Sequence, residues 1–355
     1  ENGSYGSVHD YYYEGSGHNY DPDIDCYGPI QVSGTYQSYA GKEGTENAYK
    51  MVQEACKLLY QQGVDLSPYD TDGDGVVDNV YVIYAGYGQA DSNKPNTIWP
   101  HSWNLSTIGA DIQLGNVKID RYATSQEING QSNKPVGIGT FVHEFGHVLH
   151  EILSDCQYNT LSGTATARDF VEMPSQFNES FASIPEIFDH FARHTVTGEP
   201  MPAELKERML ESINFQTAYS LGENLASTWV DLAWHKISPD EVPSPYMAGA
   251  FEKEQLHNAG LLNTQIPPRY STSYFNHVWG GGYAAGYYSY LWTEVLAVNI
   301  ADYFKQHGAL DPAVGQALRD KILSRGNTKD QMLMFTDFTG MEKPDASGLL
   351  KARGL

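Results

Sequence analysis

One short run in the chain has the residue types and the spacing of a zinc site: His143, Glu144, Phe145, Gly146 and His147. Residues four apart lie on one face of a helix, so the two histidines can present imidazole nitrogens to a single Zn²⁺. Glu144 projects beside them, where its carboxylate can accept a proton from a water that the metal activates. The alternative is two surface histidines on an ordinary helix. The pattern favours zinc because Phe145 and the apolar residues four and seven positions later form a separate core face.

Two histidines leave a catalytic zinc one protein ligand short, and Glu172 is the candidate for the third. It lies in the segment 169–176, where Pro174 is typical of the first turn of a helix. Taken alone, a glutamate at such a position is more often a solvated residue that interacts with the helix dipole. The segment by itself therefore leaves both interpretations open.

A second group of carboxylates follows the spacing of a calcium loop. Positions one, three, five and nine of the loop pattern are acidic: Asp70, Asp72, Asp74 and Asp78. Gly75 stands at the sixth position, where the loop turns, but Tyr81 replaces the bidentate glutamate at the last position. Two interpretations stay open, a Ca²⁺ site outside a helix-loop-helix and a solvated acidic turn.

The elements that must position these residues change in kind near residue 140. Residues 1–140 are rich in tyrosine and glycine and contain one amphipathic helical stripe, at 44–63. Two runs of β-branched and aromatic residues, 76–84 and 117–123, predict strands. The first part of the chain therefore predicts a helix packed on a small sheet.

The second part, residues 141–355, has the longer periods of helices, several with proline in the first turn. The predicted helices are 138–153, 174–194, 202–232, 284–306, 312–324 and 329–338, and the main breaks are 237–245 and the glycines 280–282. We expect a zincin-like α+β fold with two domains, 1–140 and 141–355. In it, a small N-terminal sheet with its helix lies over the active-site helix, and a mainly α-helical C-terminal domain follows.

The composition restricts the partners of the chain. Its 355 residues include 22 Lys and Arg against 44 Asp and Glu, a net charge of −22 that disfavours nucleic acid and anionic membranes. No apolar run approaches the roughly 18 residues of a membrane-spanning helix. Cys26, Cys56 and Cys156 have neither disulfide-framework nor zinc spacing, so we expect three small buried residues. A monomer that acts on peptides is the expected form.

Five motifs follow one another in the second part: HEFGHVLH (143–150), LSGTATARDFVEMPSQFNES (161–180), IPPRYSTSYFNHVWGGGYAAGYYSYLW (266–292), ILSRGN (322–327) and RGL (353–355). Together they resemble the thimet oligopeptidase family of zinc peptidases, in particular the bacterial peptidyl-dipeptidases. The resemblance implies one Zn²⁺ held by His143, His147 and Glu172, with Glu144 as general base and acid. It also implies a group that faces the substrate: His277, Tyr283, Tyr287 and Tyr290.

The spacing of the three tyrosines agrees with that implied role. As residues i, i+4 and i+7 of a helix, Tyr283, Tyr287 and Tyr290 share one face, from which phenol hydroxyls can donate to the oxyanion of a peptide under attack. Packing is the common alternative for such a stripe, and it is the role expected of Tyr288, which points elsewhere. The glycines 280–282 let this segment move over a bound peptide or simply form a tight turn.

The first part carries different motifs: ENGSYG (1–6), YDTDGDGVVDNVYVIYAGYG (69–88), IWPHSW (98–103) and IGTFVHEFGH (138–147). They resemble the secreted immune inhibitor A family of metallopeptidases. Both families use HEFGH, so the two patterns meet in the zinc-binding helix, and we interpret the chain as a hybrid. After His147 it continues with VLHEILSD, as the oligopeptidases do, and lacks the Gly-Leu-Pro-Asp of the secreted family.

The predicted function is zinc-dependent hydrolysis of peptide bonds, chiefly in oligopeptides, with Glu144 as the general base. Two alternatives stay open: a catalytically silent hybrid that binds zinc and calcium, and a secreted endopeptidase of the immune inhibitor A type. The first part of the chain points to a secreted protein and the second part to a cytoplasmic one, so both locations stay open.

Overall fold

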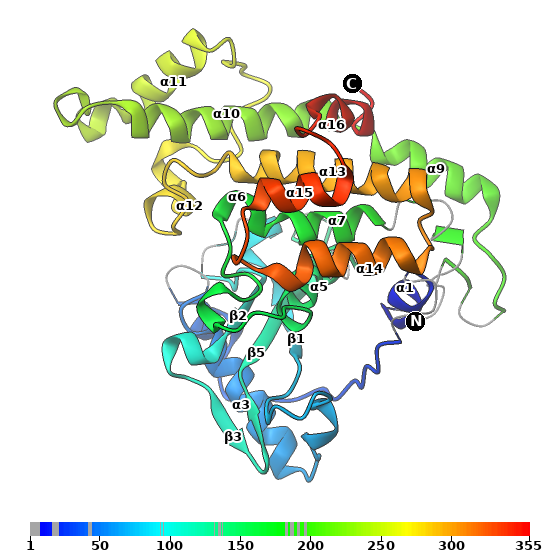
Figure 1. The fold of residues 1–355 in the computed structure, drawn as a ribbon. Coiled ribbons are helices and arrows are strands. Elements are labelled where there is room, and N and C mark those ends of the chain that lie inside the picture. The colour runs from blue at the N-terminus through cyan, green and yellow to red at the C-terminus, as the bar shows by residue number, and fades with distance from the viewer. Residues whose placement is uncertain are drawn as a thin grey trace. The chain divides into compact units, whose positions relative to one another are not determined.

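The computed structural model describes residues 8–15, 21–41, 45–92, 94, 96–130, 132–133, 136, 138–181, 184, 188–189, 192–194 and 197–355. The chain forms two compact units. The sheet unit is Asn19–Thr164 with Leu323–Gly326, and the helical unit is Glu1–His18, Ala165–Ile322 and Asn327–Leu355. Figure 1 shows the strands in the first unit and the long helices in the second.

The centre of the sheet unit is a three-stranded sheet in the order β1-β5-β2. β1 (Val80–Tyr87) runs parallel to β5 (Arg121–Ile128), and β2 (His101–Asn104) runs antiparallel to β5. β3 (Ile112–Leu114) and β4 (Val117–Ile119) form a separate two-stranded sheet. Of these strands, the sequence did not predict β2 or β3.

The two predicted strands differ from the observed ones at their ends. The run 76–84 enters the sheet only at Val80, because Val76 instead forms an isolated bridge with Lys118. The run 117–123 divides into β4 and β5 at Asp120, whose carboxylate accepts a hydrogen bond from the backbone N–H of Ser106 at 2.6 Å. That bond ties the residue between the two strands to the segment that follows β2.

The predicted helix 44–63 is confirmed as α3 (Ala48–Gln61). Its buried stripe, including Val52 and Cys56, packs in one core cluster with residues of the strands such as Tyr122. Two short helices, α2 (Tyr36–Ala40) and α4 (Gln89–Ser92), complete this part, and α5 (Ile138–Ile152) contacts both β5 and β2. The unit has the mixed, zincin-like arrangement that the sequence predicts, with the HEFGH helix packed on a small sheet.

The helical unit is built around one long helix, α13. Its helices are α1 (Val8–Gly15), α6 (Arg168–Val171), α7 (Met173–Phe181), α9 (Ala203–Ile213), α10 (Thr217–Lys236), α11 (Ala248–Asn258), α12 (Asn276–Trp279), α13 (Ser289–His307), α14 (Pro312–Lys321), α15 (Gln331–Thr339) and α16 (Ala346–Ala352). α13 contacts α6, α7, α15 and α16. On α13, the Phe304 ring lies 5.0 Å from Phe177 and 5.7 Å from Phe181, both on α7, measured between centroids. None of the described helices combines the length and the apolar character that crossing a membrane requires.

The helix predictions hold where capping residues mark the ends. The predictions 312–324 and 329–338 are confirmed as α14 and α15, whose N-caps Asp311 and Asp330 each accept a backbone N–H. The prediction 202–232 is wrong in its continuity, because the chain breaks between α9 and α10 at Gln216, where φ is +57°. The sequence did not predict α11 and α16.

Two further helix predictions are correct only in part. The prediction 284–306 is confirmed as α13 only from Ser289 onward. The prediction 174–194 is confirmed as far as Phe181, where α7 ends, and much of the remaining span lies outside the described residues.

The three cysteines are free, and they differ in burial. Cys56 is buried on α3, as predicted, and burial raises the pKa of its thiol to about 12. The prediction is wrong for Cys26, which is exposed because it lies in segment 21–32, which has no regular secondary structure and is mostly exposed. Cys156 is half-buried.

Candidate metal centre

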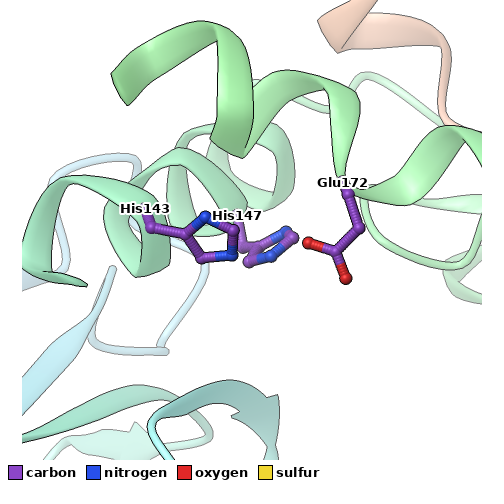
Figure 2. Close-up of side chains that lie close together, drawn as sticks. All are labelled: His143, His147 and Glu172. Atoms are coloured by element: carbon purple, nitrogen blue, oxygen red, sulfur yellow. The ribbon is translucent and has the colours of Figure 1, made fainter. Parts of the chain in front are cut away.

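α5 presents the two predicted zinc ligands of the sheet unit on one face. Val142, Phe145 and Val148 are buried, whereas His143 and His147 are only half-buried. The two imidazole centroids lie 5.1 Å apart with an interplanar angle of 82°, and Figure 2 shows both rings on the same side of the helix. Two imidazoles in this arrangement suit the ligand preference of Zn²⁺.

Glu144 lies between these histidines in the sequence, and it is buried, with only 6% of its surface exposed. Tyr81 of β1 lies nearby, and its ring packs against Phe141 at a centroid distance of 4.3 Å. Burial raises the pKa of the Tyr81 hydroxyl, and the negative charge of Glu144 raises it further. Tyr81 therefore stays protonated at neutral pH. The sequence pointed to Tyr81 only as the last position of the acidic loop, because its place near α5 depends on the pairing of β1 and β5.

His150 lies one turn beyond His147 on α5 and is completely buried. Neither of its ring nitrogens has a hydrogen-bond partner among the residues that the structure describes. Burial, with a smaller effect of His147, lowers the pKa of His150 to about 3. This imidazole is therefore neutral in the folded protein across the physiological range.

Glu172 belongs to the helical unit, at the C-terminal end of α6, and Figure 2 draws it with the two histidines. Its side chain is buried, with 6% exposed. The carboxylate accepts a hydrogen bond from the Tyr283 hydroxyl at 3.1 Å and one from Ser175 Oγ at 3.4 Å. Glu172 is therefore not the solvated first-turn glutamate that the sequence left open.

The helical unit brings the predicted substrate-facing residues together around Glu172. The rings of Tyr283 and Tyr290 stack at 5.3 Å, and Tyr287 lies 5.4 Å from Tyr290. His277 lies 5.5 Å from Tyr287 and 6.0 Å from Tyr283. Four predicted residues thus form one aromatic group, which we call the tyrosine cluster: His277, Tyr283, Tyr287 and Tyr290.

The prediction that the three tyrosines share a helical face is wrong. Only Tyr290 is on α13, and the residues before Ser289 form consecutive turns. Ala285 has a φ of +54°, which a regular right-handed helix does not allow. The cluster therefore forms through a turn that folds back on itself.

Asp231 of α10 holds this turn. The residue is completely buried, and its carboxylate accepts the backbone N–H of Ala285 at 2.9 Å and that of Tyr287 at 2.8 Å. His235 Nδ1 lies 2.9 Å from the same carboxylate. Asp231 was not predicted as a site residue, although it is the one charged residue among the largely apolar residues 225–234.

The surroundings keep the cluster in a hydrogen-donating state. Burial raises the pKa of Tyr283 to about 12, with a further increase from Glu172. Burial also raises the pKa of Tyr287 and, together with Glu172, that of Tyr290. For His277, burial lowers the pKa to about 4, helped by Arg269 and opposed by Glu172. At neutral pH the phenols are protonated and His277 is uncharged.

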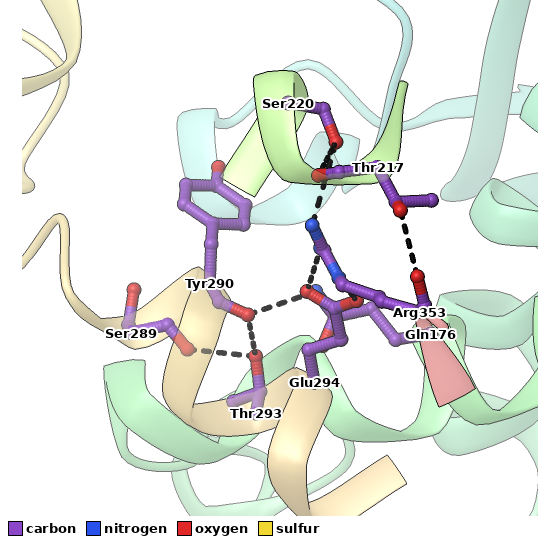
Figure 3. A network of polar contacts seen from close by, with 8 residues as sticks. All are labelled: Gln176, Thr217, Ser220, Ser289, Tyr290, Thr293, Glu294 and Arg353. Carbon is purple, nitrogen blue, oxygen red and sulfur yellow. Dashed lines mark hydrogen bonds and ion pairs between the residues drawn. The ribbon is translucent and has the colours of Figure 1, made fainter. Parts of the chain in front are cut away.

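A polar network fixes the first turns of α13, as Figure 3 shows. Gln176 of α7 donates to the carbonyl of Tyr290 at 3.1 Å. Four residues further on, Glu294 accepts the guanidinium of Arg353, with Nε–Oε1 at 3.0 Å and Nη2–Oε2 at 2.6 Å. The terminal RGL motif therefore has a structural role, because Arg353 ties the end of α16 to the helix that carries Tyr290.

Tyr288 does not pack in the core, contrary to the prediction. It is 38% exposed, and its hydroxyl donates to Asp169 at 2.8 Å. The reason is the same turn, which directs Tyr288 away from Tyr287 and towards α6.

The acidic loop of the sheet unit gathers three of its four predicted residues. Asp70, Asp72 and Asp78 each offer a carboxylate oxygen, and these oxygens lie within 4.8 Å of one another. Asp74 is not part of the group, and its carboxylate lies 3.5 Å from the guanidinium of Arg121.

Comparison with known proteins finds two family matches. Peptidase family M3 matches residues 135–355. The family described as immune inhibitor A peptidase M6, catalytic domain, matches residues 1–176. The two matches overlap in a stretch that contains α5 and Glu172.

Individual relatives match about three fifths of the chain. The dipeptidyl carboxypeptidase of Salmonella typhimurium is 44% identical over 216 residues, and oligopeptidase A of Escherichia coli is 37% identical over 222 residues. Each alignment covers 61% of this chain but 31% of the relative, so the chain spans about a third of their length. A solved structure of a Pyrococcus furiosus carboxypeptidase aligns with 92% of this chain and 70% of its own, at a TM-score of 0.43 and 14% identity.

Proposed function

Because the chain belongs to peptidase family M3, we propose that it is a zinc-dependent peptidase that hydrolyses oligopeptides. The observation that carries the proposal is the face of α5, where His143 and His147 lie together with Glu144 between them in sequence. We assign the third ligand to Glu172, whose buried carboxylate is already oriented by Tyr283. Two imidazoles and one carboxylate are a donor set typical of catalytic zinc sites.

Zinc in such a site supplies a Lewis acid and lowers the pKa of water towards neutrality. Glu144 then handles the proton: its carboxylate takes one from the attacking water and passes it to the leaving amine. Tyr81 beside it is protonated and does not compete as a base.

The tyrosine cluster serves the carbonyl oxygen of the substrate. Tyr287, Tyr290 and His277 can each donate a hydrogen bond, because the phenols are protonated and a neutral imidazole carries one N–H. Donors that are fixed before the reaction stabilise the charge that develops on this oxygen without reorganising. Tyr283 has a different task, since its hydroxyl already orients Glu172.

Glu144→Gln tests this mechanism. The variant should retain stoichiometric zinc, measured by inductively coupled plasma mass spectrometry, and lose about a hundredfold or more of its activity on an internally quenched peptide. The control is Glu127→Gln, which replaces an exposed glutamate of β5 and should change neither quantity. Full activity in Glu144→Gln would contradict the proposal.

The dipeptidyl carboxypeptidase and oligopeptidase A suggest different modes of cleavage. A peptide with a free C-terminus and the same peptide with an amidated C-terminus distinguish these modes. A peptidase that removes dipeptides from the C-terminus needs a free terminal carboxylate, whereas an oligopeptidase also cleaves the peptide when that end is amidated. Mass spectrometry of the products from the free and the amidated peptide therefore distinguishes the two.

The match of residues 1–176 to the immune inhibitor A family supports a second candidate, a secreted endopeptidase. Such an enzyme should cut an intact folded protein as well as a short peptide. Stoichiometric zinc without cleavage of any substrate would instead support a silent hybrid that only binds metal.

We also infer that Asp70, Asp72 and Asp78 bind Ca²⁺. In support, their carboxylates converge, and Asp70 Oδ1 is buried without a hydrogen-bond partner among the described residues. Carboxylate oxygens are the ligands that Ca²⁺ prefers. Calorimetric titration with CaCl₂ should show one site that Asp72→Asn weakens and that Asp302→Asn, a change on α13, leaves intact. Absence of heat in the unmodified protein would contradict the inference.

A further inference from the structure

The helical unit contains a cavity that the proposed mechanism does not use. It has a volume of about 450 Å³, within the roughly 300–1,000 Å³ of pockets that bind small molecules. Its walls combine three aromatic rings, Phe170, Tyr288 and Trp292, with two carboxylates, Asp169 and Asp330. We call it the acidic-aromatic cavity.

Each carboxylate in this cavity is fixed by one hydrogen bond. Asp169 accepts the hydroxyl of Tyr288 at 2.8 Å, and Asp330 accepts the backbone N–H of Leu333 at 2.9 Å. Within the part of the chain that the structure describes, neither Asp169 nor Asp330 forms an ion pair. The cavity therefore has two negative charges that the protein does not neutralise.

The two basic residues next to these carboxylates in sequence, Arg168 and Lys329, interact with other residues. Arg168, next to Asp169 in sequence, lies over the ring of Tyr283 at 4.5 Å from its centroid. Lys329, next to Asp330, pairs with Asp337. Neither of these two neighbouring cations therefore pairs with a carboxylate of the cavity.

The aromatic walls favour an organic cation over a small hydrated ion. Trp292 and Tyr288 are 36% and 38% exposed, so both residues are accessible, whereas Phe170 is buried. Ammonium and guanidinium groups bind to the faces of such rings, and tryptophan is the strongest partner. Their aliphatic stems gain further from contact with apolar surface.

We propose that the acidic-aromatic cavity binds the basic side chain, lysine or arginine, of a peptide substrate. The proposal rests on the proposed peptidase function, because it takes the ligand to be part of the peptide. Backbone continuity links the cavity to the tyrosine cluster. Asp169 stands three residues before Glu172, and Tyr288 follows Tyr287 directly. The cavity and the tyrosine cluster are therefore formed by the same two chain segments.

Binding is tested first, without any cleavage. The probes are Nα-acetyl-lysine amide and Nα-acetyl-arginine amide, with the uncharged norleucine and citrulline amides as their matched controls. The readout is the indole N–H signal of Trp292 in NMR spectra, assigned with the variant Trp292→Phe. Both basic amides should shift this signal at lower concentration than their uncharged counterparts.

Asp330→Asn should weaken the binding of both basic amides about threefold or more. Asparagine is also a good N-cap, so α15 keeps its N-terminal hydrogen bond. The matched control is Asp311→Asn, which changes the N-cap of α14 outside the cavity and should have no effect. Equal binding of charged and uncharged amides, or unchanged binding in Asp330→Asn, would overturn the proposal.

Cleavage is tested next, with quenched peptides that contain lysine or arginine in place of norleucine or citrulline at one position in turn. The basic peptides should have the higher kcat/KM at one position, and Asp330→Asn should remove that preference while Asp311→Asn keeps it. If no peptide is cleaved but the amides still bind, the peptidase function fails, and with it the role of the cavity in binding substrate, whereas its affinity for basic groups is upheld. If peptides are cleaved without basic preference and the amides do not bind, the cavity assignment fails alone.

Discussion

Replacing Asp231 by asparagine tests how the tyrosine cluster is held. The buried carboxylate accepts two backbone N–H groups, those of Ala285 and Tyr287, one on each oxygen. Asparagine has nearly the same shape, but it places an amide NH₂ group opposite one of these donors. The variant therefore loses one charge-assisted hydrogen bond and leaves one backbone N–H without an acceptor.

The expected loss of stability follows from these two changes. A hydrogen bond to a charged group contributes about 1.5–3 kcal/mol, and a buried unsatisfied group costs about 1–3 kcal/mol. Removing a buried negative charge recovers part of this sum. We therefore expect Asp231→Asn to lower the free energy of unfolding by about 2–4 kcal/mol.

Urea unfolding followed by circular dichroism measures the loss, and hydrogen exchange locates it. The amides of Ala285 and Tyr287 should exchange faster in Asp231→Asn, and activity on peptides should fall because Tyr287 and Tyr283 lose their fixed positions. Asp240→Asn, on an exposed turn after α10, is the control that should change none of these. The reasoning is refuted if the variant unfolds within about 0.5 kcal/mol of the unmodified protein and those two amides keep their protection.

Three further predictions concern other parts of the molecule. His150 has a folded-state pKa of about 3, below the ordinary 6.5, so below pH 6.5 only the unfolded chain takes up its proton and stability falls. In zinc-free protein, the free energy of unfolding should fall between pH 7.5 and pH 5 by about 2 kcal/mol less in His150→Leu than in the unmodified protein. Equal decreases in the two proteins would contradict this prediction. Tyr283→Phe should weaken zinc binding about 10–100-fold in a chelator competition, whereas the exposed Tyr274→Phe should not. Arg353→Ala should lower the free energy of unfolding by about 1–3 kcal/mol in thermal melts, Arg353→Lys should restore only part of it, and Lys351→Ala should have no effect.

Features that depend on local chain geometry were predictable from the sequence. The spacing of His143 and His147 predicts two imidazoles on one face, and α5 carries them so. The apolar stripe that ends at Gly63 predicts α3 for the same reason, since helical periodicity and a glycine stop are local properties.

Features that depend on contacts between distant segments were not predictable. Asp231 reaches across more than fifty residues of chain to the turn at Ala285, and without that contact the tyrosine spacing looks helical. Tyr81 reaches Glu144 only because β1 pairs with β5, a pairing that the strand pattern does not specify. The break between α9 and α10 at Gln216 was not predictable either, because no glycine or proline stands next to it in the sequence.

The return of the chain into the sheet unit at Leu323–Gly326 affects how the protein is made. There Ser324 accepts the backbone N–H of Asp155 at 2.9 Å, and Gly326 lies so close to Leu161 that an added Cβ would come within 2.0 Å of its carbonyl oxygen. Residues 323–326 leave the ribosome only after most of the helical unit has been synthesised. The sheet unit therefore cannot finish folding early in translation. For the same reason, a recombination event that transferred only residues 1–164 would transfer an incomplete sheet unit, because residues 323–326 of that unit are encoded much later in the gene.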